Sequence, residues 1–206
     1  MLLVDDYKRM TAAFFLRNNL EAFENFKIYK EMVENEMDSI IKFLRYDNGG
    51  EFSSKEFMDY CRNHGIKGQF SVSRTPQHNL VVERKNKTVH EMDRTMLMDS
   101  KLIDIFWTQA VHTTIHIQNK VMLRNNTNKN PYELWKGRPT NVKHFRVFGG
   151  KCYIKREDGR MGNFDSNVDK GVLVGYSSTR KAYKCYNLRL NKDVESINVT
   201  INETCR

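Results

Sequence analysis

Asp47 is the first residue whose type and position could take part in catalysis. It follows a predicted strand over 40–46, and the carboxyl end of a strand is where α/β sheets place functional groups. The run Asp47-Asn48-Gly49-Gly50 is also a common turn sequence, so a plain strand-to-loop turn is the structural alternative.

Glu83 is the second candidate. It lies near the start of a predicted helix over 80–99, and the next turn of that helix presents Asn86 and Lys87 on the same face. The structural alternative is a solvated charge on a helix surface. Glu83 follows Asp47 by 36 positions, so 35 residues separate the two carboxylates.

The elements that must position these residues alternate between strand and helix up to residue 122. Apolar runs predict strands over 2–4, 11–16, 40–46 and 66–72. Helical spacing predicts helices over 19–37, from Ser53 or Ser54 to near Gly65, over 80–99 and over 103–122. The alternation favours an α/β layer over 1–122.

The last third of the chain has a different composition. Residues 123–144 are predicted to be a linker, and residues 145–206 hold short β-rich runs that predict a small β-barrel. These runs are Phe145 to Val147, Cys152 to Ile154, Gly171 to Val174, and Ala182 to Tyr186.

Positive charge is concentrated in the same segment. The whole chain has a net charge of +9, and residues 136–206 alone hold 15 Lys and Arg against 7 Asp and Glu. This segment is therefore the predicted polyanion-binding part. A basic aromatic face for nucleic acid could be formed by Lys151, Lys155, Lys181 and Lys184 with Tyr153, Tyr176, Tyr183 and Tyr186. Ordinary alternation along the strands of a small barrel would give the same pattern.

Other site classes and a membrane role are not indicated. The four cysteines are widely spaced and form no Cys-x-x-Cys pair, which argues against a zinc module. His112 and His116 stand four apart on a core-like pattern, so a structural role is predicted for them. The longest apolar run, Ala12 to Leu16, is far shorter than the roughly 20 residues of a membrane span. A chain of this kind, without a signal-peptide pattern, is expected in the nucleus or cytoplasm and not to be secreted.

Several separate motifs together resemble the integrases of copia-type retrotransposons. They are LRYDNGGEF over 44–52, TPQHNLVVERKN over 75–86, NPYELWKGRP over 130–139, HFRVFG over 144–149 and KGVLVGYS over 170–177. The first two resemble the second and third acidic motifs of the family, and the interval of 35 residues matches its D,D-35-E pattern. The last three resemble the passage from the catalytic core to an SH3-like module. The resemblance covers essentially the whole chain.

The resemblance implies a fold and an activity. The implied fold is α/β: an RNase H-like integrase core lacking its first strand over 1–122, a linker, and a small SH3-like β-barrel over 145–206. The implied activity is DNA integration by strand transfer, with two Mg²⁺ (or Mn²⁺) ions activating the attacking oxygen and stabilising the leaving one. Asp47 would help to bind the first ion and Glu83 the second.

The resemblance also implies partners. DNA, as element ends and target, is the expected ligand, and self-association is expected. Asn86 and Lys87 match positions that face the DNA end, and the helix around Arg84 and Lys87 is the alternative DNA-binding surface to the basic tail.

Departures from the family pattern limit the expected activity. The family's first Asp lies on a strand that would precede Leu2, and Asp5 and Asp6 match hairpin residues instead, so residues 1–206 are expected to be inactive. Leu80 stands where the family has Gly, which would strain the helix entry if that position needs a positive φ. The alternative function is a non-catalytic nucleic-acid-binding or multimerisation module.

Overall fold

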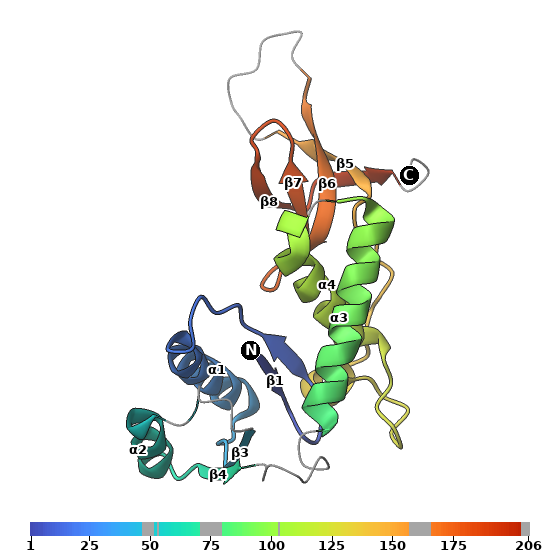
Figure 1. The fold of residues 1–206 in the computed structure, drawn as a ribbon. Coiled ribbons are helices and arrows are strands. Elements are labelled where there is room, and N and C mark those ends of the chain that lie inside the picture. Colours follow the sequence, from blue (N-terminus) through green and yellow to red (C-terminus); the bar gives the residue numbers. More distant parts are fainter. Residues whose placement is uncertain (47–51, 53, 71–79, 103, 157–165, 203–206) are drawn as a thin grey trace. The chain divides into compact units, whose positions relative to one another are not determined.

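The structure is a computed structural model and describes residues 1–206 except 47–51, 53, 71–79, 103, 157–165 and 203–206 (Figure 1). The elements of the first half are β1 (Leu2–Val4), β2 (Thr11–Ala13), α1 (Glu21–Met37), β3 (Phe43–Tyr46), α2 (Lys55–Asn63), β4 (Lys67–Phe70) and α3 (Leu80–Ser100). Those of the second half are the 3₁₀ turn η2 (Asp104–Phe106), α4 (Trp107–Val121), α5 (Pro131–Lys136), β5 (Lys151–Lys155), β6 (Val168–Tyr176), β7 (Tyr183–Asn187), β8 (Lys192–Ser196) and β9 (Val199–Asn202).

The chain forms two compact units, which are described separately. One holds residues 1–3 and 12–87, and the other holds residues 4–11 and 88–206. This division passes through helix α3, whereas the predicted boundaries lie at 122 and 145. No helix in the described part of the chain has the length and apolarity that a membrane crossing requires.

The first unit confirms the predicted alternation of strands and helices. Strands β3 and β4 are parallel, with Leu44 opposite Gly68 and Tyr46 opposite Phe70. β1 and β2 form a separate two-stranded sheet, so in the described residues no ladder joins the two pairs. Helices α1 and α2 close over a core of buried side chains at Phe26, Tyr46, Phe57, Cys61 and Ile66.

Local sequence explains where these helices begin and which face they bury. The Ser54 side chain accepts a hydrogen bond from the Phe57 N–H and caps α2, within the predicted start at Ser53 or Ser54. Asn18 accepts from the Glu21 N–H before α1, while Glu21 accepts from the Arg17 N–H. The side chains that α1 buries are Ala22, Phe26, Tyr29 and Val33, whereas Leu20, just before the helix, is exposed.

The second unit joins the rest of α3 and helix α4 to a five-stranded antiparallel sheet, in the order β8-β7-β6-β5-β9. One core lies between the helices and the sheet, at Leu97, Phe106, Ala110, Phe148 and Val174. The other face of the sheet encloses a second core of Cys152, Ile154, Leu173 and Cys185.

The interval over 123–144 is not the plain linker that was predicted, because it contains helix α5. Asn130 and Glu133 form a capping box, Pro131 occupies the first turn, and Gly137 ends the helix with a φ of 66°. Trp135 of this helix lies beneath the Lys8 ammonium, 5.0 Å from ring centroid to Nζ. Helix α5 is thereby fixed to the N-terminal hairpin.

The strand predicted over 145–147 is wrong. That segment is irregular, and its backbone bonds to a side chain in place of a neighbouring strand. The Arg146 N–H donates to the Tyr176 hydroxyl at 2.9 Å, and the same hydroxyl donates to the Arg146 carbonyl at 3.1 Å. Phe145 packs on Tyr176 and His116. The aromatic residue of this segment thus belongs to a cluster of rings and not to the face of a strand.

Candidate functional site

Strand β3 ends at Tyr46, the residue that precedes Asp47 in the sequence. Tyr46, its last residue, is buried in the core of the first unit, and burial raises the pKa of its phenol. The ring lies over Gly68 of the neighbouring strand, where a Cβ would approach the Tyr46 hydroxyl to 2.7 Å. Asp47 itself lies outside the described residues, so its distance from Glu83 stays a prediction.

Glu83 lies in the first turn of α3 with its side chain exposed. A carboxylate in the first turn interacts favourably with the helix dipole. Asn86 and Lys87 follow at three and four positions and are also exposed, so the three side chains share one face of the helix. A carboxylate, an amide and an ammonium thus lie on this face, and their roles in a site stay predictions.

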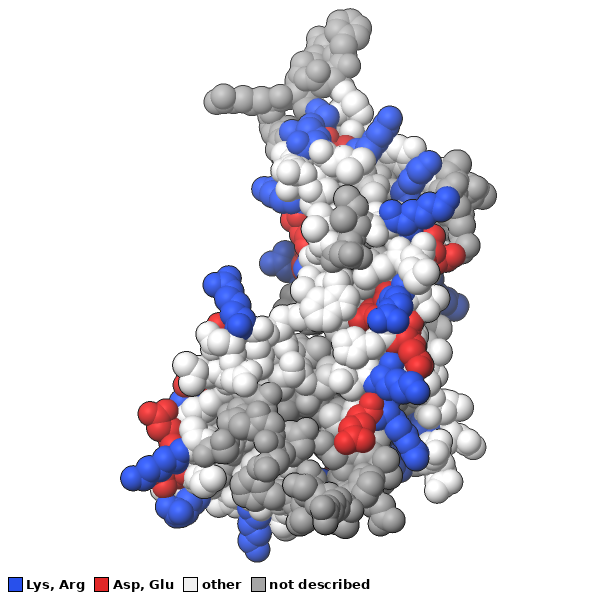
Figure 2. Space-filling view, viewed as in Figure 1, with Lys and Arg blue, Asp and Glu red and all other residues white. Residues whose placement is uncertain are grey.

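The neighbouring cations on α3 differ in exposure. Arg84 is exposed, whereas Lys85 is half-buried and burial lowers the pKa of its ammonium. Leu80 is the first residue of the helix and has the right-handed helical backbone conformation, which any L-residue adopts. The position therefore needs no positive φ, and leucine in place of glycine causes no backbone strain there. Figure 2 shows Lys and Arg side chains together with Asp and Glu on the visible surface of the chain.

Asp5 and Asp6 serve the hairpin turn. The Asp5 carboxylate accepts a short hydrogen bond from the Lys8 N–H, and the Asp5 carbonyl accepts from the Arg9 N–H at 3.0 Å. Asp6 forms an ion pair of 2.8 Å with the Arg9 guanidinium. These contacts account for both residues, as the sequence predicted. In the described part of the chain no three His, Cys, Asp or Glu residues gather into a metal-binding group.

The four predicted lysines of the sheet have different surroundings. Lys151 and Lys155 are exposed on β5, and Lys181 is exposed in the connection between β6 and β7. Lys184 on β7 is partly buried and lies 3.5 Å from the Asp193 carboxylate. The structure therefore brings Lys151 and Lys155 together on one strand and places Lys184 beside an acidic partner.

Three of the four predicted tyrosines are occupied by other contacts. Tyr176 stacks on His116 at a ring distance of 4.8 Å, the Tyr183 hydroxyl donates to the His144 carbonyl at 2.9 Å, and Tyr186 packs edge-on against Phe106. His116 is therefore structural, as predicted. Burial, Lys120 and His144 lower its pKa to about 4.

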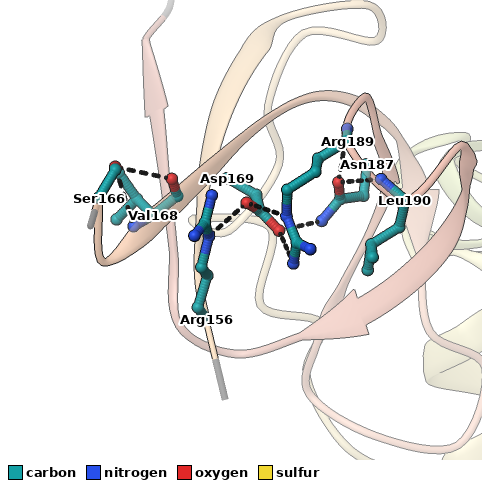
Figure 3. Close-up of polar contacts among 7 residues, drawn as sticks. All are labelled: Arg156, Ser166, Val168, Asp169, Asn187, Arg189 and Leu190. Carbon is teal, nitrogen blue, oxygen red and sulfur yellow. Dashed lines mark hydrogen bonds and ion pairs between the residues drawn. The ribbon is translucent and has the colours of Figure 1, made fainter. Parts of the chain in front are cut away.

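Two features of the sheet were not found from the sequence. Lys170 lies directly opposite Tyr153 in the pairing of β5 with β6. Asp169, beside it, is buried between Arg156 and Arg189 (Figure 3). Both residues lie before the predicted strand, which began only at Gly171, whereas β6 begins at Val168.

Comparison with known proteins gives consistent results in both halves of the chain. Residues 151–206 match the family model of the retroviral polymerase SH3-like domain. Over 201 residues the chain is 31% identical to the retrovirus-related Pol polyprotein from transposon TNT 1-94 of Nicotiana tabacum, covering 98% of this chain and 15% of that protein. It is 29% identical to the corresponding polyprotein from transposon RE2 of Arabidopsis thaliana, covering 100% of this chain and 14% of that protein. The chain thus spans about 15% of the length of these curated relatives.

Solved structures show the fold. The simian T-cell lymphotropic virus intasome aligns with a TM-score of 0.55 at 14% identity, covering 100% of this chain and 72% of the matched chain. The HTLV-2 integrase catalytic core domain, solved in complex with magnesium in a trimeric form, aligns with a TM-score of 0.50 at 17% identity, covering 65% of this chain and 82% of that one. The fold is therefore an RNase H-like integrase core followed by an SH3-like module.

Proposed function

This chain belongs to the retrovirus-related Pol polyproteins of transposons, of which it is an integrase fragment, and we propose that it binds DNA and supplies carboxylates for metal-dependent strand transfer. The observation that carries the proposal is the face of α3 on which exposed Glu83 is followed by Asn86 and Lys87. On this face a metal-binding oxygen and phosphate-binding groups lie within one helical turn.

Asp47 and Glu83 are the residues that would hold magnesium. Glu83 fits this role because its carboxylate is a hard oxygen donor, is exposed, and is carried by a regular helix. Asp47 directly follows Tyr46, the buried last residue of β3, in the sequence. Two bound ions would activate the attacking oxygen and stabilise the leaving oxygen of a phosphodiester.

The α3 cations would position the DNA end. Lys87 and Arg84 are exposed on the same helix as Glu83, so a phosphate bound to them is held near that carboxylate. Asn86 can donate its amide N–H to a phosphate or accept from a sugar hydroxyl. In the second half of the protein, Lys151 and Lys155 of β5 would contact the DNA backbone. Contacts by Lys181 and Lys184 stay predictions.

Self-association is part of the same proposal. The neighbours include an intasome and a catalytic core in trimeric form. We expect this chain to form multimers when it binds DNA, which sedimentation velocity with and without a DNA duplex would measure. A monomer in both conditions would contradict this part of the proposal and leave the metal site untouched.

A strand-transfer assay with Mg²⁺ or Mn²⁺ tests the catalytic proposal. The substrate is a labelled DNA end, and the protein is residues 1–206 preceded by an added strand that bears an aspartate. Transfer should occur and should be lost in Glu83→Gln and Asp47→Asn, while DNA affinity stays within about twofold because phosphate contacts come mainly from Lys and Arg. Glu91→Gln, also exposed on α3, is the matched control.

Two outcomes would contradict it. Transfer that survives both substitutions would remove Asp47 and Glu83 from the site. DNA binding without transfer in every protein tested would favour the non-catalytic nucleic-acid-binding module.

A further inference from the structure

Tyr153 is the aromatic residue that the sheet leaves exposed to a ligand. Its side chain is exposed to 37%, and among the described residues it makes no ring contact or side-chain hydrogen bond. Tyr176, Tyr183 and Tyr186 are each held by the contacts given above. An exposed tyrosine ring on a regular strand presents a flat apolar surface at a fixed orientation.

Three lysines surround this ring on the same face of the sheet. Lys151 and Lys155 lie two positions before and after Tyr153 on β5, and side chains two apart on a strand point to the same face. Lys170 is directly opposite Tyr153 on β6, and Thr200 is opposite it on β9. All three lysines are exposed, and no ion pair holds any of them within the described part of the chain.

No carboxylate balances these charges on the strands that form the face. β5 and β9 contain no acidic residue, and Asp169 is the single acidic residue of β6. Asp169 is paired with Ile154 across the ladder, so its side chain lies on the opposite face of the sheet and is buried. The Tyr153 face, defined as Lys151, Tyr153, Lys155 and Lys170, therefore carries positive charge around one exposed ring.

The buried Asp169 also makes the face rigid. Its carboxylate accepts from Arg156 Nε at 2.6 Å, from Arg189 Nε and Nη2 at 2.7 and 2.8 Å, and from Asn187 Nδ2 at 2.9 Å (Figure 3). These groups come from the end of β5, the end of β7 and the turn that follows β7. The network ties the three strands together beside the Tyr153 and Lys170 pair, so the backbone that carries the ring and the lysines is held in place before any ligand binds.

We propose that the Tyr153 face binds an unpaired segment of nucleic acid, with one base stacked on the Tyr153 ring and the neighbouring phosphates bound to Lys151, Lys155 and Lys170. A base can stack on an exposed ring only if its own face is free, which holds for unpaired nucleotides and not for the interior of a duplex. Lysine ammonium groups bind phosphate as point charges, so recognition tolerates different sequences.

This inference deepens the proposed function. It rests on one part of that proposal, namely that the basic sheet binds nucleic acid. It names the form of nucleic acid, a single strand, it selects Tyr153 from the four predicted tyrosines, and it adds Lys170 to the residues that bind the strand. Integration substrates with frayed or unpaired ends would supply such a segment.

Fluorescence anisotropy with the full chain tests the inference. The probes are a labelled 20-nucleotide oligo-dT, an oligo-U of the same length and a 20-base-pair duplex. Tyr153→Ala should weaken oligo-dT binding at least about fivefold, because stacking on an aromatic side chain contributes roughly that much or more per base. The duplex affinity should change less than twofold. Tyr153→Phe, which keeps the ring, should bind oligo-dT as the unchanged chain does.

The lysines give a second readout. Lys170→Ala should make the negative slope of log affinity against log salt shallower by about 0.7 on oligo-dT. This is the value for one lost phosphate contact on a single strand. Lys192→Ala is the matched control: Lys192 is opposite Asn187 on the edge strand β8 and so belongs to the other face of the sheet. Its slope should be unchanged. Equal binding of oligo-dT and oligo-U would show that the sugar is not read.

The outcomes separate this inference from the proposed function. Oligo-dT binding that is equal in Tyr153→Ala and in the unchanged chain, with duplex binding present, overturns the stacking site and leaves DNA binding intact. A chain that binds none of the probes overturns both. Circular dichroism confirms that each variant keeps its fold.

Discussion

His116 shows how a single ring couples pH to stability. It stacks on Tyr176, its Nε2 is buried without a hydrogen-bond partner among the described residues, and its pKa is lowered to about 4. Lys120 and His144 face it, and both oppose a positive charge at this position. The pKa of His144 is itself lowered by burial and by Lys120. The ring cluster therefore tolerates a neutral His116 only.

The expected consequence is a loss of stability in mild acid. Between pH 6.5 and 4 the unfolded chain binds a proton at residue 116 that the folded chain does not, so the free energy of unfolding falls as pH falls through that window, by up to about 3 kcal/mol. Above pH 7 the residue has no effect on the pH dependence. Urea unfolding at pH 7.5 and pH 5 measures it, and His116→Phe should reduce the difference. An unchanged difference would assign the effect to other groups.

Asp169 predicts a separate transition at lower pH. The Arg189 and Arg156 guanidinium groups and the Asn187 amide hold the pKa of this carboxyl well below its usual range. The stabilisation is therefore complete above about pH 4 and is lost as pH falls below that value.

Asp169→Asn should destabilise the sheet at pH 7 by about 2 to 3 kcal/mol, because it leaves two guanidinium groups without their carboxylate. Thermal unfolding at pH 7 measures the change. Asp193→Asn, on the edge strand β8, is the control and should cost less because Asp193 is more exposed. Equal effects of the two substitutions would show that the buried network contributes no more to the free energy of unfolding than the exposed ion pair does.

Among the elements, helix α5 was missed although its signals were present. Asn130, Pro131, Glu133 and Gly137 form a start and stop pattern that predicts a short helix. Six residues are too few to show a hydrophobic period, which is why the segment was interpreted as a linker. Strands β8 and β9 were missed for a related reason, because their alternating residues are mostly polar and half-exposed.

Asn130 should account for much of the stability of α5. Its Oδ1 accepts from the Glu133 N–H at 2.9 Å and from the Thr140 hydroxyl at 3.1 Å. Asn130→Ala should lower the free energy of unfolding by about 1 kcal/mol, whereas Asn130→Asp, which keeps the accepting oxygen, should lower it less. Thermal unfolding followed by circular dichroism measures the change. Equal losses in both variants would contradict a capping role.

The candidate site was predictable only where sequence spacing decides it. Glu83, Asn86 and Lys87 share a face because helical geometry requires it, and the structure shows all three exposed on α3, while their roles stay predictions. The partition of the lysines could not be predicted, because Lys184 and Lys155 look alike in the sequence and differ only in the strand that each one faces. Asp193, the partner of Lys184, comes from another strand.

For the whole molecule, the number of carboxylates predicts the outcome of catalysis. Mg²⁺ requires near-octahedral oxygen coordination, and under the proposed function Asp47 and Glu83 would provide two of the three acidic ligands that the family resemblance implies. Residues 1–206 expressed alone should therefore bind DNA and show no strand transfer with Mg²⁺. Activity should appear when a strand that bears an aspartate is added before Met1. Transfer by residues 1–206 that Asp5→Ala or Asp6→Ala abolishes would assign the third ligand to the hairpin.

The close approach of Gly68 to the Tyr46 hydroxyl restricts which residues can occupy positions 68 and 46 together. A side chain at 68 collides with that hydroxyl, while a phenylalanine at 46 would remove the colliding atom, so the two positions constrain each other. Tyr46 immediately precedes Asp47 in the sequence. A substitution at Gly68 of β4 would therefore act on the residue next to the candidate site without contacting the site. Related sequences with a larger residue at 68 should therefore carry a residue without the phenol hydroxyl at 46.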